Sequence, residues 1–170
     1  MIQTIKKYLK EEIDIEMFDE VESTNNICKE IGKGDFNNTL LITRAQTGGR
    51  GRLGRSFISK KDKGIYMSLL LKPTLSLADV SKITCVVGTS ILKVLSEYIN
   101  ERLYIKWVND IYLHDKKICG ILTESESKNK IVLVYHHVQL SADSYIFEEA
   151  YWLIGPLVMI QYPHLLLALW

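Results

Sequence analysis

The chain has 170 residues, 47% of them hydrophobic and 24% charged, and its formal net charge is +1. This length and composition suit one compact domain, and the balanced charge gives no general reason to expect nucleic acid, an anionic membrane or an acidic partner. Three cysteines without a CxxC pair, and an N-terminus without a continuous apolar run, predict a reduced protein of the cytoplasm.

Strands and helices alternate in the first half of the chain. Residues 16–21 (EMFDEV) alternate in polarity as a strand does, and Ser23-Thr24-Asn25 then supplies N-cap chemistry. A helix is predicted to run from there through about Ile31, with Gly32 placed to end it. Residues 38–45 and 64–72 are rich in Leu and Ile and predict two further strands. A loop rich in glycine and arginine connects these two strands.

The second half adds one long helix and a hairpin. Residues 77–99 carry apolar side chains at three- and four-residue spacings, which predicts a helix that packs on a sheet. Residues 103–107 and 110–113 are predicted short strands, and 117–124 returns as a hairpin partner. From residue 131 onward the pattern weakens, although IVLVYHHV is compatible with a strand. Together the elements predict an α/β or α+β fold in which helices flank a mixed sheet.

The connecting loop, Thr47 to Ser56 (TGGRGRLGRS), is called the arginine loop below, and it is similar to two phosphate-binding motifs. It fits GxGxxG, and it fits the Walker A pattern except that Arg55 replaces the lysine. Both motifs need a helix directly after the loop, because the N-terminus of that helix holds the phosphate. A charged run and then strand periodicity follow Ser56 instead, so we reject both motifs.

The arginine loop still has the composition of an anion site. Its glycines expose backbone N–H groups, and Arg50, Arg52 and Arg55 can hydrogen-bond an anion in a bidentate way. From Arg44 to Lys72 there are eight basic residues and one acid, Asp62. A phosphate or carboxylate ligand suits this region. The alternatives are a solvated surface loop and an RNA-binding segment, although the latter usually repeats and carries aromatic residues.

A second group of polar residues falls on the predicted hairpin. Lys106 and Lys117 can meet phosphate or carboxylate oxygens, and Asn109 with Asp110 can hold Mg²⁺ through oxygen. The plainer alternative is that Asn109-Asp110 forms a turn and that Lys117 is a surface lysine of an edge strand. The hairpin alone leaves both interpretations open.

Taken together, these segments resemble the biotin protein ligases, the family that joins biotin to a lysine of a carboxylase carrier domain. GRGRLGR (49–55) resembles the signature loop of the family, KWVND (106–110) its KWPND motif, and KKICG (116–120) its KxxG hairpin. Ser23-Thr24-Asn25 and Gln46 also fall where the family contacts biotin. The four matches occur in the right order along the chain.

The resemblance extends over roughly residues 16–124 and implies the catalytic fold of the biotin and lipoate ligases, which is similar to that of class II aminoacyl-tRNA synthetases. It also implies a reaction in two steps. Biotin and ATP, with Mg²⁺, give biotinyl-5′-AMP and pyrophosphate. A lysine of the biotin carboxyl carrier protein of acetyl-CoA carboxylase, or of a similar carboxylase, then attacks the mixed anhydride. The implied partners include neither nucleic acid nor a membrane, and a homodimer is compatible with the family.

Individual residues receive roles from the same resemblance. The biotin site would comprise Ser23, Thr24, Asn25, Gln46, Arg50, Gly51, Ser68 and Gly120. The ATP and adenylate site would comprise Gly49, Arg52, Arg55, Phe57, Lys106 and Asn109. Lys117 and Arg52 would be the catalytic residues, and Asn109 and Asp110 would serve the metal. The glycines of the arginine loop would let it fold over the adenylate and exclude water.

The sequence departs from the family in several places. Val108 replaces a proline, and Phe57 replaces the tryptophan that stacks on adenine. After Glu124 we find neither the GxGxNxN strand nor the SH3-like domain of the family. No helix-turn-helix motif precedes the catalytic region, so repressor activity is not expected.

We therefore divide the chain into an incomplete catalytic-type domain, 1–130, and an atypical apolar tail, 131–170. This division predicts a truncated or frame-shifted gene product. The alternative function is that of a non-catalytic truncated fragment that binds only biotin or nucleotide. Residues 151–170 carry no Asp, Glu, Lys or Arg and could reach across a bilayer, but Pro156 and Pro163 interrupt the run, so we do not favour a membrane helix.

Overall fold

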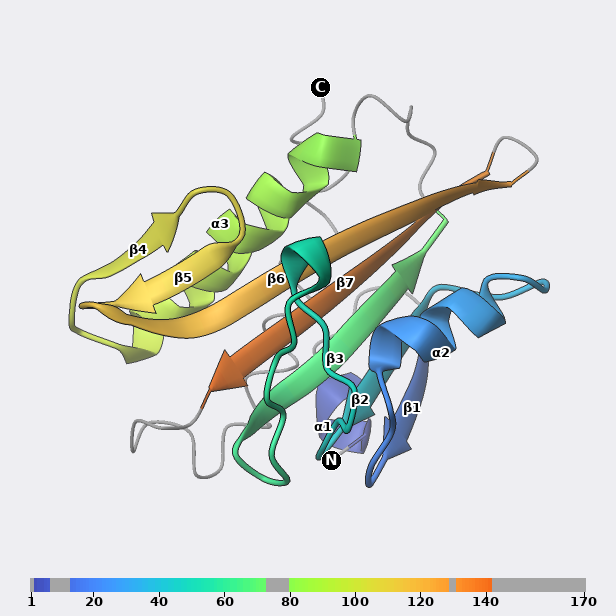
Figure 1. Cartoon of the computed structure of the whole chain (residues 1–170), viewed down its shortest axis with the longest axis horizontal. Coiled ribbons are helices and arrows are strands. Elements are labelled where there is room, and N and C mark those ends of the chain that lie inside the picture. Colours follow the sequence, from blue (N-terminus) through green and yellow to red (C-terminus); the bar gives the residue numbers. More distant parts are fainter. Residues whose placement is uncertain (1, 7–12, 73–79, 129–130, 142–170) are drawn as a thin grey trace.

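The fold is built on one mixed sheet of seven strands (Figure 1). We describe it from a computed structural model, which describes residues 2–6, 13–72, 80–128 and 131–141. In sheet order the strands are β1 (Asp14–Phe18), β2 (Thr39–Thr43), β3 (Gly64–Leu71), β7 (Ile131–Ser141), β6 (Lys116–Lys128), β5 (Asp110–Leu113) and β4 (Leu103–Lys106). β1 and β2 pair in parallel, and the other neighbouring strands pair antiparallel. The predicted mixed α/β fold is confirmed.

Helices lie on both faces of this sheet. α2 (Thr24–Ile31) lies in front of β2 and β3 in Figure 1, and α3 (Val80–Tyr98) crosses behind β4, β5 and β6. The short α1 (Ile2–Lys6) precedes β1, and a single 3-10 turn, η1 (Arg52–Gly54), lies within the arginine loop. The two faces of the sheet are therefore covered differently, by a long helix on one side and by α2 with the arginine loop on the other.

Side-chain alternation along the strands separates these two faces. Met67 and Leu69 of β3 belong to the main core, which includes Val87 and Ile91 of α3. Leu70 of β3 points the other way, into a small cluster beneath α2. Because successive side chains of a strand point to opposite faces, the polar Ser68 shares the α2 face with Leu70. The α2 face therefore carries a buried polar side chain, Ser68, while the α3 face holds most of the apolar core.

Most predicted elements lie within a few residues of the observed ones. α2 begins after Ser23, whose backbone is extended as at an N-cap, but the Ser23 side chain makes no capping hydrogen bond. The helix ends at Ile31, and Gly32 follows it in a right-handed conformation (φ −63°) instead of the left-handed one typical of a glycine that ends a helix. β1 spans 14–18 rather than 16–21, because Val21 makes only an isolated bridge to Gln46. Residues 77–79 of the helix predicted over 77–99 lie outside the described residues.

The segment with the weakest sequence pattern forms a central strand. β7 pairs antiparallel with β3 over residues 134–141 and with β6 over 131–140. It thereby joins the β1-β2-β3 half of the sheet to the β4-β5-β6 half. The strand that IVLVYHHV suggested is present and is longer than that run. The division of the chain after residue 130 stays a prediction.

The cysteines Cys28 and Cys119 are buried free thiols, and burial raises the pKa of each well above the ordinary value.

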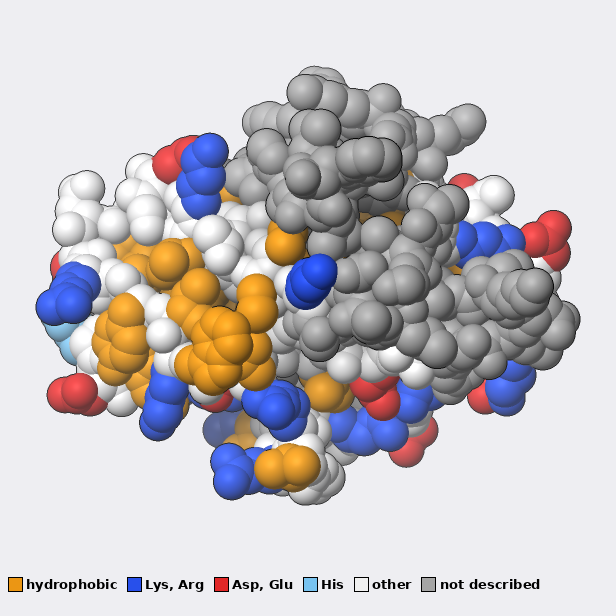
Figure 2. All heavy atoms as spheres, turned by 90° about the horizontal axis from the view of Figure 1, so that it is seen from above, with side chains coloured by type: hydrophobic (Ala, Val, Ile, Leu, Met, Phe, Trp, Pro, Cys, Tyr) orange, Lys and Arg blue, Asp and Glu red, His pale blue; other side chains and the backbone are white. Residues whose placement is uncertain are grey.

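The surface has an apolar region. Figure 2 shows apolar side chains gathered on the side of β4 and β5, and Trp107, in the turn between these two strands, is 80% exposed. Within the described ranges, no helix has both the length and the apolar character needed to cross a membrane. The charge-free run 151–170 lies outside those ranges.

Candidate functional site

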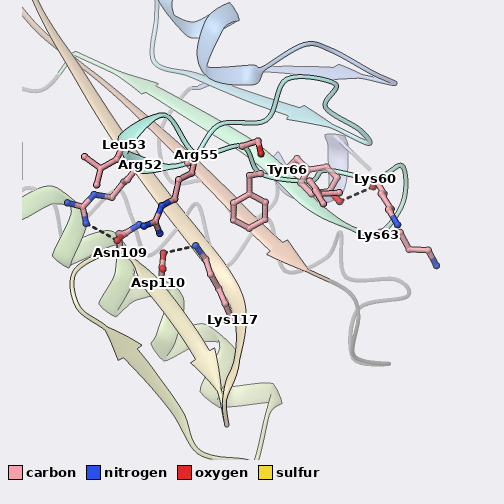
Figure 3. A pocket seen from close by; sticks show the side chains of 13 residues that line it. Arg52, Leu53, Arg55, Lys60, Lys63, Tyr66, Asn109, Asp110 and Lys117 are labelled. Carbon is pink, nitrogen blue, oxygen red and sulfur yellow. Dashed lines mark hydrogen bonds and ion pairs between the residues drawn. The ribbon is translucent and has the colours of Figure 1, made fainter.

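A pocket of about 600 Å³ lies between the arginine loop and the β5-β6 hairpin. Five cationic side chains and one carboxylate are among the residues that line it. Figure 3 shows Arg52 and Arg55 at one end, Lys117 and Asp110 below them, and Tyr66, Lys60 and Lys63 toward the other end. The lining residues are Gly51, Arg52, Leu53, Arg55, Ser56, Phe57, Ile58, Lys60, Lys63, Tyr66, Asn109, Asp110 and Lys117.

The arginine loop is a closed hairpin-like unit. The Gly51 N–H donates to the Arg55 carbonyl at 2.7 Å, and the Phe57 N–H donates to the Gly49 carbonyl at 2.8 Å. At its tip Leu53 is left-handed, with φ 57°, and 90% exposed. A Cβ atom on Gly49 would lie only 2.5 Å from the Phe57 carbonyl oxygen, so the two arms can approach only with glycine there. β3, and not a helix, follows the loop, which confirms the rejection of the two phosphate-binding motifs.

A β-bulge turns Lys117 toward the pocket. Ile111 of β5 pairs with Cys119 and the next residue, Tyr112, pairs with Lys117, so β6 has one extra residue at this point. Ile118 and Cys119 are both buried in the main core although they are consecutive. The extra residue shifts the alternation of side chains, and Lys117 therefore lies on the face opposite the core.

Lys117 is held between a carboxylate and an aromatic ring. Its Nζ lies 2.8 Å from Asp110 Oδ1 and 5.0 Å from the centre of the Phe57 ring. A Cβ atom on Gly120 would lie 2.9 Å from Phe57 Cε2 and 3.0 Å from Lys117 Nζ. Gly120 thus leaves the space in which the ammonium group and the ring meet. The charge of Lys117 is neutralised by one partner that a ligand anion can replace.

Asn109 links the hairpin to the arginine loop. Its amide nitrogen donates to the Ile121 carbonyl at 3.1 Å, and this contact fixes which way the amide faces. Its Oδ1 then accepts a hydrogen bond from Arg52 Nη1 at 3.0 Å. Arg52 comes from the loop tip, so this bond joins two segments that are 57 residues apart.

A buried polar network lies on the same face, at the start of α2. Thr24, Asn25, Gln46 and Ser68 are each at most 6% exposed, and we call these four residues the polar network. Gln46 Oε1 accepts from the Thr24 N–H at 3.0 Å, and the Thr24 and Ser68 hydroxyls lie 2.6 Å apart. Ser68 Oγ in turn donates to Asn25 Oδ1 at 2.6 Å. Buried polar groups that are mutually satisfied hold fixed orientations, so the network can present a defined pattern of donors and acceptors.

Glu124 on β6 connects this network to the arginine loop. Its carboxylate accepts hydrogen bonds from Asn25 Nδ2 at 2.8 Å and from Lys29 Nζ at 2.7 Å, and it lies 3.7 Å from Arg50 Nη2. Burial alone would raise the pKa of Glu124, but the hydrogen bonds from Lys29 and Asn25 and the nearby charges of Lys29 and Arg50 lower it overall. The carboxylate is therefore held in its charged form.

Arg50 has an unused donor near this junction. Its Nη2 donates to Asn26 Oδ1, but its buried Nε–H has no hydrogen-bond partner within the part of the chain that the structure describes. A buried guanidinium N–H without a partner is unusual in a folded protein. It is available to a ligand that enters beside the arginine loop.

The residues singled out from the sequence fall into three groups. Gly51, Arg52, Arg55, Phe57, Asn109, Asp110 and Lys117 line the pocket, with Gly120 beneath Lys117 and Gly49 at the base of the loop. Ser23 is buried beside the polar network formed by Thr24, Asn25, Gln46 and Ser68, and Arg50 lies between the two groups. Lys106 stands apart, since it does not line the pocket and its Nζ lies 5.1 Å from the centre of the Tyr112 ring.

Several residues of the site carried no signal in the sequence. Ser59 is buried and accepts a hydrogen bond from Gln46 Nε2 at 3.1 Å, which orients that amide. Glu124, Lys60, Lys63 and Tyr66 also belong to the site or its edges. Glu124 is the last residue of the strand predicted over 117–124, but β6 continues past it to Lys128 with further polar residues, so polarity does not single it out.

Comparison with known proteins identifies the family. The profile of the Biotin/lipoate A/B protein ligase family matches residues 17–141, so this chain belongs to that family. It is 32% identical to the bifunctional ligase/repressor BirA of Bacillus subtilis over 111 residues, which are 65% of this chain and 34% of that protein. It is 29% identical to a biotin--[acetyl-CoA-carboxylase] ligase of Paracoccus denitrificans over 111 residues, 64% of this chain and 46% of that protein. The match thus spans about a third to a half of these curated relatives.

Solved structures agree with the family assignment. The biotin protein ligase of Aquifex aeolicus in complex with biotin and ATP superposes with a TM-score of 0.68 at 26% identity, covering 86% of this chain and 68% of that one. The biotin protein ligase of Leishmania major in complex with biotin superposes with a TM-score of 0.67 at 20% identity, and the superposition covers 89% of this chain and 72% of that one. The second likeness concerns the fold alone.

Proposed function

We propose that this chain carries the adenylating site of a biotin protein ligase, which activates biotin with ATP and transfers it to a lysine of a carboxylase carrier domain. The observation that supports this best is the position of Lys117, Arg52 and Arg55 around one pocket, beside a buried polar network. The similar ligase of Aquifex aeolicus was solved with biotin and ATP, the same pair of substrates that we assign here.

In the first step, a carboxylate oxygen of biotin attacks the α-phosphorus of ATP. A new O–P bond forms, the bond to the β-phosphate oxygen breaks, and its electron pair leaves with pyrophosphate. Both reactants are anions, so their approach needs positive charge. Lys117 supplies it by exchanging Asp110, 2.8 Å away, for the incoming oxygens, and Arg52 and Arg55 add charge from the loop.

The polar network is suited to the neutral ring system of biotin. That ring carries N–H donors and a carbonyl acceptor, which need matching groups in a dry site. Thr24, Asn25, Gln46 and Ser68 offer hydroxyl and amide groups of both kinds. The unused Nε–H of Arg50 is a further donor at the edge of this network.

The nucleotide would enter as its Mg²⁺ complex. Asp110 is the one carboxylate among the pocket-lining residues, and the described residues contain no group of three or more His, Cys, Asp or Glu side chains that could hold a metal. A single carboxylate beside an amide fits Mg²⁺ that is bound mainly by phosphates and water. Asn109 and Asp110 would therefore meet a metal that arrives with ATP, and Phe57 would stack on the adenine.

In the second step, the amine of the carrier lysine attacks the carbonyl carbon of biotinyl-5′-AMP. An amide bond forms, AMP leaves with the electron pair of the C–O bond, and the amine loses a proton to solvent. Hydrolysis competes with this transfer, so water must be kept out until the carrier arrives. We assign this role to the arginine loop, and the hydrogen bond that links it to the hairpin, from Arg52 to Asn109, supports the assignment.

Labelling of a carrier domain tests the proposal. The full chain is incubated with biotin, Mg·ATP and the biotin carboxyl carrier domain of acetyl-CoA carboxylase, and the product is detected by streptavidin blotting. We expect labelling that needs ATP and that is lost when the acceptor lysine of the carrier is replaced by arginine. Binding of biotin and ATP in calorimetry without labelling would instead support a non-catalytic binding fragment.

A further inference from the structure

The pocket continues beyond the residues that the proposed adenylation uses. Past Tyr66, at the end opposite Arg52, Lys60 and Lys63 line the pocket wall (Figure 3). Neither lysine belongs to the motifs shared with the biotin protein ligases. They lie in the turn that leads from the arginine loop into β3.

The backbone of this turn is anchored. The Lys63 N–H donates to the Lys60 carbonyl at 3.2 Å, and the hydroxyl of Tyr66 donates to the same carbonyl at 2.8 Å. Tyr66 is only 1% exposed, so it fixes the turn from inside the protein. Asp62 is left-handed, with φ 57°, which closes the turn tightly. The two lysines therefore start from a fixed backbone.

The charged residues of the turn over 60–63 fall into two groups: Asp62 and Lys61 form ion pairs outside the pocket, and Lys60 and Lys63 line the pocket. Asp62 accepts two hydrogen bonds from Arg44, at 2.7 and 2.6 Å, and Lys61 pairs with Asp19 at 2.6 Å. Asp62, which lies between the two lysines in the sequence, is thus neutralised by Arg44. Among the described residues, the ammonium groups of Lys60 and Lys63 have no hydrogen bond or ion pair. Their positive charge is left for a ligand in the pocket.

The chemistry of the pocket points to a phosphate chain as that ligand. Asp110, the one carboxylate among the pocket-lining residues, already faces Lys117, so Arg52, Arg55, Lys60 and Lys63 remain as an excess of positive charge. We propose that Lys60 and Lys63 form a subsite for the β- and γ-phosphates of the nucleotide and hold pyrophosphate as it leaves. This inference rests on the proposed function. Lysine suits the role because its ammonium group is a compact charge that stabilises the anion formed on the leaving oxygen.

Two variants of the full chain test the subsite. One carries Lys60→Ala together with Lys63→Ala, and the matched control carries Lys61→Ala, which removes the neighbouring charge outside the pocket. We expect the double variant to bind pyrophosphate at least about tenfold more weakly in calorimetry and to raise the KM for ATP by a similar factor. The KM for biotin stays unchanged in both variants, and the control behaves as the wild type.

Other results would overturn the subsite. Pyrophosphate affinity that is equal in the double variant and the control would do so. So would a higher KM for the carrier domain at an unchanged KM for ATP, which would assign the lysines to an acidic protein surface. If the wild type binds pyrophosphate through these lysines but labels no carrier, the subsite stands and the proposed function fails.

Discussion

Glu124 on β6 and Asn25 at the start of α2 share a hydrogen bond of 2.8 Å although 99 residues separate them. The same carboxylate also contacts Lys29 and Arg50, so it links α2, the sheet and the arginine loop. Asn25 in turn accepts from Ser68 within the polar network. The orientation of that network therefore depends on a residue that need not touch a ligand.

This relationship predicts the effect of Glu124→Gln. Glutamine can accept the hydrogen bond from Asn25 but loses the charge that attracts Lys29 and Arg50. We expect the KM for biotin to rise by about tenfold with a smaller change in kcat, since positioning is disturbed more than chemistry. Glu124→Ala should have a larger effect, because it leaves the buried Asn25 amide without a partner. Equal KM values for wild type and both variants would exclude this positioning role.

The same carboxylate predicts a pH dependence of stability. Because the pKa of Glu124 is lower in the folded chain than its ordinary value of 4.5, its contribution is present above about pH 4.5 and is lost as the pH falls through the folded value. The difference in Tm between wild type and Glu124→Gln should therefore shrink between pH 6 and about pH 3. Glu30→Gln is the control, since among the described residues the carboxylate of Glu30 makes only an exposed pair with Lys33. A Tm difference that does not change over this pH range would contradict the prediction.

Gly120 should not tolerate a larger residue. In Gly120→Ala the added Cβ would lie within 3.0 Å of both Phe57 Cε2 and Lys117 Nζ, so the ammonium group and the ring must move. Displacement of a catalytic group by about 1 Å can cost about a hundredfold in rate, so we expect a loss of ten- to about a hundredfold in biotin-dependent ATP–pyrophosphate exchange. Gly34→Ala is the control, because the nearest atom to its added Cβ is 3.7 Å away. Similar exchange rates for the two variants would show that the space at Gly120 is unimportant.

Arg52 is predicted to retain the adenylate. Its hydrogen bond to Asn109 is the link between the tip of the arginine loop and the hairpin, and Arg52→Gly removes it. We expect less radiolabelled biotinyl-5′-AMP to stay with the protein on a desalting column. Leu53→Gly changes the same turn without removing the bond, since Leu53 is 90% exposed and left-handed, a conformation that glycine adopts readily. If both variants retain the adenylate as the wild type does, the arginine loop does not retain it.

The sequence predicted those secondary-structure elements that depend on neighbouring residues along the chain. Ser23 and Gly32 flank α2 as predicted, although Ser23 makes no side-chain capping bond and Gly32 is not left-handed. The strand periodicity after Ser56 correctly excluded a helix directly after the arginine loop. Side chains of the two motif regions come together around one pocket, among them Arg52 and Arg55 of the arginine loop and Asn109, Asp110 and Lys117 of the hairpin.

Features that arise from tertiary structure were not predictable in this way. The bulge at Ile118 depends on the register between β5 and β6, and it decides on which face Lys117 lies. The partners of Glu124 and Ser59 are distant in sequence, so no local pattern indicates them. Lys106 shared a motif with Asn109 and Asp110, yet the end of β4 carries it away from the pocket, toward Tyr112.

The central claim is that Lys117 provides the charge that lets biotin and ATP react in this pocket. Biotin-dependent ATP–pyrophosphate exchange, measured with Lys117→Ala and with Lys116→Ala as the neighbouring surface control, tests it most directly. We predict a loss of about a hundredfold or more for Lys117→Ala and near wild-type exchange for Lys116→Ala. Near wild-type exchange by a folded Lys117→Ala variant would contradict the claim.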